Sequence, residues 1–318
     1  MTGTLKRILK VTSNIGSNII DAPIVVLLYH RVARLQEDFE LLTVSPDNFD
    51  SQIAYIKSHY PVLRFDEDWS KVRTPAVVIT FDDGYADNYH NALPILEKHN
   101  VPATFFVTSG ILDVTHEFWW DELGQIILDS THRYPEEWID YDTQILTRNI
   151  DENRSLYQYQ QKKLKSASVE ERRKILDNLI EWSGKKTYLR DDFRSMDYYE
   201  LKQLHANNFA AIGSHTLNHV QLSALDYNTQ FNEISEGHNR LGKIIGAELN
   251  TFSYPFGAIE DYNLDSLSIC KTLGFKKVAA NYPGQYHRWS DNLQIPRKLV
   301  RNWDMRFFKS YLKRAFYL

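Results

Sequence analysis

Short runs of apolar and β-branched residues alternate with longer amphipathic stretches along most of the chain. Four apolar runs have the composition of buried strands, at residues 24–30, 75–81, 103–108 and 209–214. Amphipathic spacing between them predicts helices, including one over residues 88–99 in which proline predicts a kink or a late start. Strands and helices that alternate at this spacing indicate parallel pairing, so the pattern predicts an α/β fold.

Capping residues predict where further helices begin. One begins after Ser45, because proline occupies an early helical position and Phe49, Ile53 and Ile56 then share one face. Asp226 is the predicted cap of a long helix. The same apolar spacing predicts helices over residues 198–207 and 264–273.

The alternation is interrupted between residues 112 and 196. The charged part of this stretch, residues 152–186, is rich in Lys, Arg, Glu, Gln and Leu, which favours helix. A connection of this length usually has structure of its own and often forms a lid. We therefore predict one main domain, residues 23–318, with a mostly helical insertion at about 112–196.

Residues 1–22 are predicted to form a separate amphipathic segment. Apolar residues at positions 4–20 are interspersed with Lys6, Arg7 and Lys10, which predicts a helix that packs on the domain or touches an anionic membrane surface. No run approaches the ~20 apolar residues that span a bilayer. The N-terminus also lacks the apolar core of a secretory signal. We therefore expect a cytoplasmic protein, with peripheral contact at the inner membrane face as an additional expectation.

Composition narrows the classes of partner. The chain has 318 residues with 37 basic and 41 acidic side chains, so its net charge is −4. This balance offers no electrostatic case for nucleic acid as a partner. The single cysteine, Cys270, cannot form an internal disulfide, which is compatible with a reducing compartment. Nothing in the composition indicates an oligomeric state.

Two polar clusters that follow predicted strands are the main candidates for chemistry. Asp82 and Asp83 follow one strand, and His215 and His219 follow another. The carboxyl ends of strands in α/β folds meet at one rim, so the clusters can lie together. Two imidazoles and one carboxylate leave room for water, a set that suits zinc or a related first-row metal. Each cluster alone is more often a turn, a cap or ordinary surface, but their joint occurrence favours a metal site.

These clusters carry a resemblance to a known family. The sequences TFDDG at residues 80–84 and HTLNH at residues 215–219 resemble the first two motifs of the NodB-type polysaccharide deacetylases, carbohydrate esterase family 4. The resemblance extends from about Ile24 to Arg297 and is interrupted by the insertion. It implies a distorted (β/α)7-type barrel.

The resemblance also implies roles for the two clusters. Asp83, His215 and His219 would bind one divalent metal, with zinc as the first choice and cobalt, nickel, manganese or iron as alternatives. Asp82 would be the general base.

The family's third motif departs here from its usual form. Ser253 stands where the family has an arginine that steadies the base. The resemblance implies that the backbone N–H of Phe256 binds the oxyanion, and we expect Tyr254 to contact the substrate. Taken alone, the Pro-Phe-Gly turn at residues 255–257 is also explained by backbone geometry.

The family's C-terminal histidine motif is not evident, and two other residues are candidates for the missing groups. A Tyr-His pair at the first strand is similar to the poly-N-acetylglucosamine deacetylase-like branch, in which the histidine supplies the catalytic acid. His30 is therefore the candidate acid. The extended segment 293–297 ends in arginine, as in that branch, and we predict that Arg297 replaces the missing arginine beside Asp82. A salt bridge at the rim is the alternative for Arg297.

Trp119 and Trp120 are candidate substrate contacts in the insertion. An indole ring can stack on a sugar, because it combines a broad flat face with one polar atom. The alternative is that the pair anchors the insertion.

Together these residues predict a metal-dependent hydrolase that removes an N-acyl group, N-acetyl first, from an amino sugar. The substrate would belong to a surface glycan or to its nucleotide-linked or lipid-linked cytoplasmic precursor. A sugar N-deformylase and a catalytically weak carbohydrate-binding relative remain as alternatives. A phosphoesterase is also open, although such sites commonly use two metals and more ligands than these motifs offer.

Overall fold

The computed structural model describes residues 14, 16–129, 131–140 and 143–317. The chain divides into two compact units, a main unit formed by Met1–Leu112 with Met196–Leu318 and an insertion unit formed by Asp113–Ser195. The amphipathic segment expected at residues 4–20 lies largely outside the described residues.

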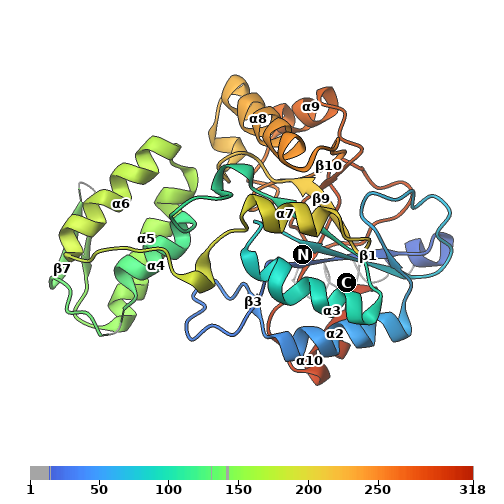
Figure 1. The fold of residues 1–318 in the computed structure, drawn as a ribbon, viewed down its shortest axis with the longest axis horizontal. Helices are drawn as coiled ribbons and strands as arrows, with labels where there is room; N and C mark the ends of the chain where they lie inside the picture. The colour runs from blue at the N-terminus through green and yellow to red at the C-terminus, as the bar shows by residue number, and fades with distance from the viewer. Residues whose placement is uncertain (1–13, 15, 130, 141–142, 318) are drawn as a thin grey trace, which may run out of the picture. The chain divides into compact units, whose positions relative to one another are not determined.

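A parallel sheet forms the centre of the main unit (Figure 1). Its strands are β1 (Ile24–Tyr29), β4 (Val62–Leu63), β5 (Ala76–Phe81), β6 (Ala103–Val107), β9 (Ala210–Ser214), β10 (Thr251–Ser253), β11 (Lys277–Ala279) and β12 (Lys298–Leu299). Their order is β11-β10-β9-β6-β5-β1-β12, and β4 pairs with β5. A small additional sheet pairs β2 (Arg31–Val32) with β3 (Thr43–Val44). The four strands predicted from apolar runs are β1, β5, β6 and β9.

One short segment connects the two edges of the main sheet. Ile295 forms a parallel bridge with Ala279 of β11, whereas Lys298 and Leu299 pair with β1. The sheet is therefore curled, and Arg297 lies on the segment where its edges meet.

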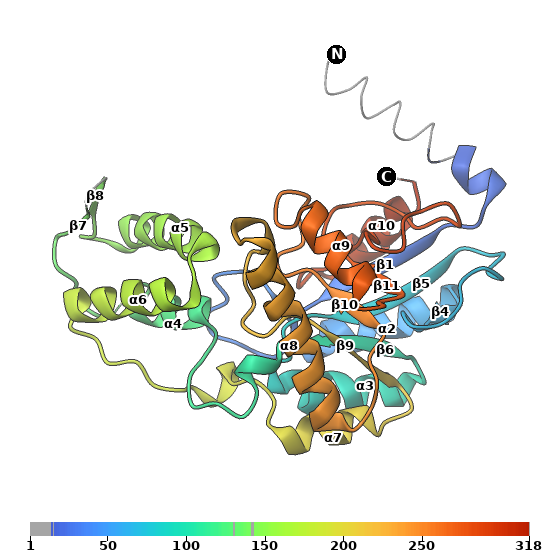
Figure 2. The same ribbon diagram turned by 90° about the horizontal axis from the view of Figure 1, so that it is seen from above.

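Helices surround the outer face of the curled sheet, and its inner face packs on side chains of the other strands and of loops, among them Val26, Phe106 and Ile295. The helices are α2 (Pro46–His59), α3 (Leu93–His99), α7 (Tyr198–His205), α8 (Tyr227–Ile245), α9 (Leu264–Thr272) and α10 (Met305–Ala315), with short turns η2 (Ser109–Ile111) and η4 (Leu222–Ala224). Figures 1 and 2 show α8 and α9 on one side of the main unit and α2 and α3 on the other. Strands β1, β5, β6 and β9 are buried along their whole length, as expected when both faces are covered.

Local sequence explains where two of these helices begin and bend. The Ser45 Oγ accepts a hydrogen bond from the Asn48 N–H, and Phe49, Ile53 and Ile56 on α2 are buried as predicted. The helix expected over residues 88–99 is divided into a π-helical turn, η1 (Asn88–Ala92), and α3. The division falls beside Pro94, which lacks the N–H of a regular turn.

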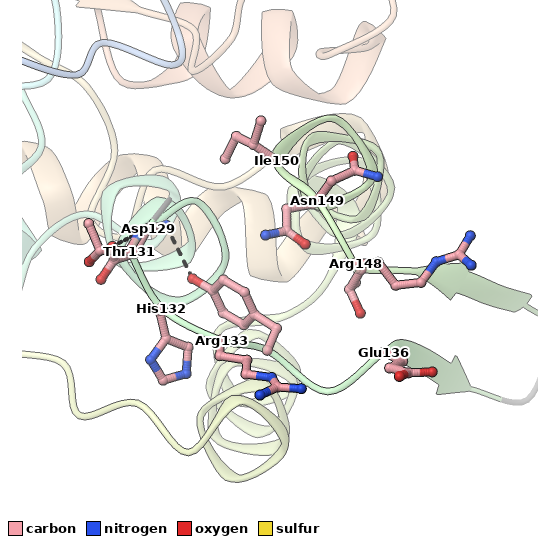
Figure 3. Close-up of a pocket in the computed structure, with 11 residues that line it drawn as sticks. Asp129, Thr131, His132, Arg133, Glu136, Arg148, Asn149 and Ile150 are labelled. Carbon is pink, nitrogen blue, oxygen red and sulfur yellow. Dashed lines mark hydrogen bonds between the residues drawn. The ribbon is translucent and has the colours of Figure 1, made fainter.

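In its described residues, the insertion unit combines three helices with a hairpin. Its elements are α4 (Trp119–Ile127), β7 (Glu137–Asp140), β8 (Thr143–Leu146), α5 (Ile150–Ser166), α6 (Val169–Ser183) and the turn η3 (Asp191–Phe193). The antiparallel hairpin β7–β8 was not predicted. A cavity of about 440 Å³ opens at the start of α5, lined mainly by polar and charged side chains such as Asp129, His132, Arg133 and Arg148 (Figure 3).

Among the described residues, we find no helix of sufficient length and apolar character to cross a bilayer.

Candidate metal centre and active site

The end of strand β6 holds both predicted metal-binding motifs at one rim of the sheet. The Asp83 carbonyl accepts a hydrogen bond from the Thr108 N–H at 3.1 Å, and the His215 N–H donates to the Val107 carbonyl at 3.1 Å. Because β6 lies between β5 and β9, it brings together residues 132 positions apart in sequence. The parallel sheet therefore explains the convergence that the sequence predicted.

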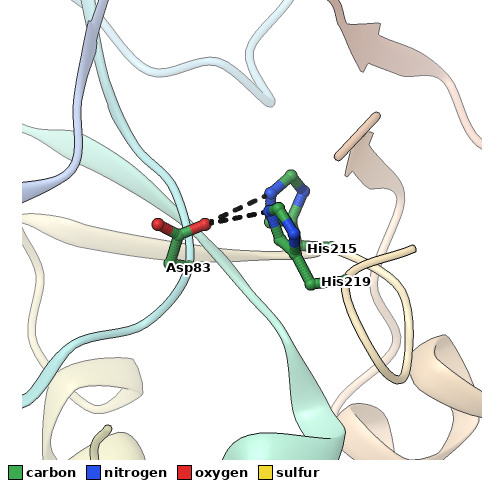
Figure 4. Close-up of side chains that lie close together, drawn as sticks. All are labelled: Asp83, His215 and His219. Atoms are coloured by element: carbon green, nitrogen blue, oxygen red, sulfur yellow. Dashed lines mark ion pairs between the residues drawn. The ribbon is translucent and has the colours of Figure 1, made fainter. Parts of the chain in front are cut away.

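Three side chains from these motifs point toward one another (Figure 4). Asp83 Oδ1 lies 3.6 Å from His215 Nε2 and 3.3 Å from His219 Nε2. All three residues are buried, and one ligand atom from each lies within 4.8 Å of the others. One carboxylate and two imidazoles match the donors that zinc and related metals prefer, so the set fits a single divalent cation.

The tautomer of His215 and the charge of Asp83 both suit metal binding. His215 Nδ1 lies 2.7 Å from the Ser253 carbonyl. A carbonyl oxygen only accepts, so Nδ1 carries the proton and Nε2 is the ligand atom. Burial alone would raise the pKa of Asp83, but the neighbouring His215 and His219 side chains hold the pKa far below the ordinary value. Asp83 is therefore ionised, as a ligand must be.

The histidine motif forms a tight loop. Thr216 and His219 both have positive φ, at 64° and 50°, and Asp83 has φ of 77°. Such conformations are unfavourable for residues with a side chain and tend to occur at functional sites. Thr216 Oγ1 accepts a hydrogen bond from the His219 N–H at 3.1 Å, which holds the loop closed.

Glu233 on α8 supports this loop and was missed by sequence reasoning. Its backbone carbonyl accepts from the Leu217 N–H. Its carboxylate accepts from the Asn218 N–H at 2.9 Å and from the Asn218 side-chain amide at 2.7 Å. Glu233 therefore holds Leu217 and Asn218, the residues between the two histidines, against helix α8.

We expect the substitution Glu233→Ala to weaken metal binding about 10- to 100-fold, the usual effect of losing a partner behind the ligands. Metal affinity measured by competition with a chelator tests this. Glu236→Ala is the matched control, because Glu236 is exposed on the same helix. Equal affinities for the two variants would contradict the supporting role of Glu233.

Asp82 forms a buried, two-point ion pair with Arg297. Asp82 Oδ1 lies 2.7 Å from Nη1 and Oδ2 lies 2.6 Å from Nη2. Ser253 Oγ lies between the two groups, donating to Asp82 Oδ2 at 3.2 Å and accepting from Arg297 Nη2 at 2.9 Å. Arg297 thus lies beside Asp82, where it was predicted. The alternative of a salt bridge at the surface rim is excluded, because Arg297 is only 1% exposed.

Neighbouring groups hold the Arg297 guanidinium in one orientation and keep Asp82 ionised. Arg297 Nε donates to the Ala280 carbonyl at 2.8 Å, and Nη1 lies 3.3 Å from Thr80 Oγ1. Burial alone would raise the pKa of Asp82, but Arg297 and His215 lower it below the ordinary value. Asp82 is therefore an ionised carboxylate held in one orientation.

His30 lies at the same rim, directly after β1. Tyr29 is paired with Phe81 in the neighbouring strand, so His30 and Asp82 follow adjacent strand ends. Burial lowers the pKa of His30, whereas the charges of Asp83 and Asp82 oppose this shift. Its buried Nδ1 has no hydrogen-bond partner within the described part of the chain. The adjacent strand ends and the effect of both charges on its pKa place the His30 ring near the carboxylates of Asp82 and Asp83.

Phe256 also lies beside the ligand set. It has φ of 60° within the turn after β10, and its ring meets that of His219 edge-on at 4.7 Å. The turn brings the Phe256 ring against one of the ligand histidines, and donation by its N–H to an oxyanion stays a prediction.

The structure corrects two of the expected substrate contacts. Tyr254 has no exposed surface, stacks on Tyr262 at 4.1 Å and donates its hydroxyl to the Leu293 carbonyl. Its side chain follows β10 into the core, so it cannot stack on a sugar.

Trp120 is only 6% exposed and stacks on Phe118 at 4.5 Å, which leaves no open face for a sugar. Trp119 is partly exposed, with the Arg172 guanidinium 5.3 Å from its ring centre. A contact between Trp119 and substrate stays a prediction.

Sequence comparisons agree with these motifs. The sequence profile of the polysaccharide deacetylase family matches residues 70–133 and 174–278, more than half of the chain. A poly-β-1,6-N-acetyl-D-glucosamine N-deacetylase of Staphylococcus aureus is 32% identical over 102 residues. That match covers 26% of this chain and 35% of the relative, so only about a third of the relative's length is spanned.

Two solved structures share the fold over nearly the whole chain. The deacetylase PplD of Streptococcus pyogenes, in complex with acetate, has a TM-score of 0.58 at 18% identity and covers 92% of this chain and 98% of its own. IcaB from Ammonifex degensii has a TM-score of 0.59 at 18% identity, with coverages of 93% and 97%. The predicted family and the NodB-type fold are thus confirmed, and the chain belongs to the polysaccharide deacetylase family.

Proposed function

We propose that this protein is a metal-dependent hydrolase that removes an acetyl group from the nitrogen of an N-acetylated amino sugar. The observation that carries the proposal is the ionised, buried Asp82, which Arg297 holds beside the ligand set of Asp83, His215 and His219. A fixed base next to a metal-binding set is what amide hydrolysis requires. Membership of the family supports the same reaction.

The residues would divide the reaction between them. A divalent metal bound by Asp83, His215 and His219 would polarise the acyl oxygen and increase the acidity of a water molecule. Asp82 accepts the proton of the attacking water, and Arg297 with Ser253 keeps its oxygens in place. A backbone N–H at Phe256 donates to the developing oxyanion, a type of interaction worth about 3 to 4 kcal/mol.

His30 would complete the reaction as the acid. The amide C–N bond breaks only when the departing nitrogen gains a proton, because an unprotonated amine is a poor leaving group. The His30 imidazolium donates that proton; burial lowers the pKa of His30, and the charges of Asp83 and Asp82 oppose this shift. The products are a free amino sugar and acetate.

The substrate is proposed to be an N-acetylated amino sugar in a surface glycan, or its nucleotide-linked or lipid-linked precursor in the cytoplasm. The name of the S. aureus relative points to polymers of N-acetylglucosamine. The free, buried Cys270 is compatible with a reducing compartment. Peripheral contact of residues 4–20 with an anionic membrane surface belongs to the same proposal and would suit a lipid-linked precursor.

Metal removal provides the test. We expect about one divalent metal per chain, loss of acetate release after chelation, and recovery when zinc, cobalt, nickel, manganese or iron is added back. The substrate panel contains β-1,6-linked N-acetylglucosamine oligomers, chito-oligomers, nucleotide sugars and lipid-linked sugars. Unchanged acetate release by metal-free protein would overturn the proposal.

Other outcomes of the same experiment favour the alternatives. Formate release would indicate an N-deformylase. Sugar binding without release of any acid would indicate a carbohydrate-binding relative. Two metals per chain with phosphoester cleavage would indicate a phosphoesterase.

A further inference from the structure

The two ends of the chain are basic and contain no carboxylate side chain. Residues 1–20 include three basic residues and residues 305–318 include four, with no aspartate or glutamate in either segment. The rest of the chain has 30 basic and 41 acidic residues. Positive charge is therefore concentrated at the ends of a protein that is otherwise acidic.

The structure brings the described parts of these two segments together. The Asn18 side-chain amide donates to the Phe316 carbonyl at 2.6 Å, and that of Asn14 donates to the Tyr317 carbonyl at 3.2 Å. Residues 16–20 and the C-terminal end of α10 thus belong to one surface, on the same side of the main unit (Figure 2).

Helix α10 presents an exposed face made of cations and aromatic rings. Its opposite face buries Phe308, Leu312 and Ala315. The exposed side chains are Arg306, Phe307, Lys309, Lys313, Arg314 and, just beyond the helix, Tyr317. Within the part of the chain that the structure describes, none of these four cations forms a salt bridge, and Lys309 lies over the Tyr55 ring.

Exposed apolar side chains continue this surface. Ile19 is 81% exposed and Ile20 is 71% exposed. Large aliphatic side chains this exposed, on the segment that contacts the C-terminal end of α10, resemble the composition of interfacial helices.

We propose that α10 and residues 16–20 form a surface that binds a bilayer containing anionic phospholipid. Anionic headgroups would pair with the cations of α10, and the boundary of the acyl chains would take Ile19, Ile20 and Phe307. A nucleic acid or another polyanion would satisfy the cations but offers no apolar layer for the isoleucines. The bilayer therefore fits both halves of the surface.

Residues 16–20 of this surface lie away from the catalytic rim. Residues 16–20 precede β1, whereas His30 follows it. Residues 16–20 and His30 therefore lie at opposite ends of the strand. Activity on a soluble substrate should not depend on the surface.

Sedimentation with vesicles tests the proposal on the full chain. We compare phosphatidylcholine vesicles with and without phosphatidylglycerol, using wild type and the variant Arg306→Glu/Lys309→Glu/Lys313→Glu. Each basic residue near an anionic bilayer strengthens binding roughly fivefold, so we expect the variant to bind the anionic vesicles at least ~100-fold more weakly. The matched control, Lys71→Glu/Lys202→Glu/Lys243→Glu, makes the same change in net charge at exposed lysines elsewhere and should bind like wild type.

Several results would overturn the proposal. Wild type that fails to sediment with anionic vesicles, or that sediments equally with neutral ones, excludes an anionic bilayer as the partner. Equal losses in the two triple variants would indicate an effect of net charge alone. Retained binding to heparin with no binding to vesicles would indicate a soluble polyanion.

Two further measurements complete the experiment. Unchanged acetate release and an unchanged circular dichroism spectrum show that the α10 variant is folded. High salt is expected to release wild type from the anionic vesicles, because salt screens the charges on both surfaces.

Discussion

The substitution Asp82→Asn is expected to lower kcat/KM for acetate release by roughly 10² to 10⁴-fold while the metal content stays near one per chain. General bases contribute a factor of this size. Asparagine has nearly the same shape as aspartate and can still accept a hydrogen bond from Arg297, but it cannot take a proton from water. Acetate release and metal content measured on the same preparation test the prediction.

Asp83→Asn is the control that separates the two neighbouring carboxylates. Asp83 is the one that faces both histidines, at 3.6 and 3.3 Å. Its replacement should therefore reduce metal content and activity together, whereas Asp82→Asn reduces activity alone. Near-normal turnover in Asp82→Asn would remove Asp82 from the mechanism. Thermal unfolding is measured for both variants, because the Arg297 charge loses its partner in Asp82→Asn.

The sequence was sufficient to predict the centre of the fold. Strands such as β1 and β5 are continuous apolar runs because both faces of a parallel sheet are buried, and that signal is local. The beginning of α2 was equally readable, since Ser45 and Pro46 act within one turn. The metal set followed from these strands, because residues at the carboxyl ends of parallel strands meet.

Other features depend on partners that are distant in sequence. Glu233 is one carboxylate among many on an amphipathic helix, and only the folded loop shows that it holds Asn218. Tyr254 was expected to contact the substrate but is buried, because the direction of a side chain after a short strand depends on register, which sequence alone does not define. The hairpin β7–β8 was masked by the helical composition of the surrounding insertion.

Arg297 is the residue for which local pattern was least informative. It lies 215 positions from Asp82, and an arginine after an apolar segment equally suits a surface salt bridge. Only the resemblance to one branch of the family placed it beside the base. In the structure the curled sheet brings its two edges together at this segment, which is what puts the guanidinium against Asp82.

Arg297→Ala is expected to have the largest effect on stability, lowering the free energy of unfolding by about 3 to 5 kcal/mol at neutral pH. Removing one partner of a buried ion pair leaves the other charge without compensation. Activity should fall as well, because Asp82 loses its fixed orientation. Denaturant unfolding and acetate release are measured on Arg297→Ala and on Arg297→Lys, which retains the charge but not the two-point contact.

The double variant Asp82→Asn/Arg297→Met identifies the cause of the loss. It removes both charges, so we expect it to recover much of the stability lost in Arg297→Ala while remaining inactive. If the double variant were as unstable as Arg297→Ala, the loss would come from packing around the long side chain and not from the unpaired carboxylate.

The dependence on pH gives a second, independent signature in metal-free protein. In wild type the pKa of Asp82 lies below its unfolded value of about 3.9, so the pair's stabilisation is present above that value and is lost as pH falls through the lower folded pKa. Without Arg297, burial should raise the folded pKa above 3.9. The variant would then gain stability as pH falls through that raised pKa, because its folded state binds the proton more tightly. The difference between wild type and Arg297→Ala should therefore be largest near neutral pH and narrow in acid, and a difference that is independent of pH would show that Arg297 acts through packing and not through charge.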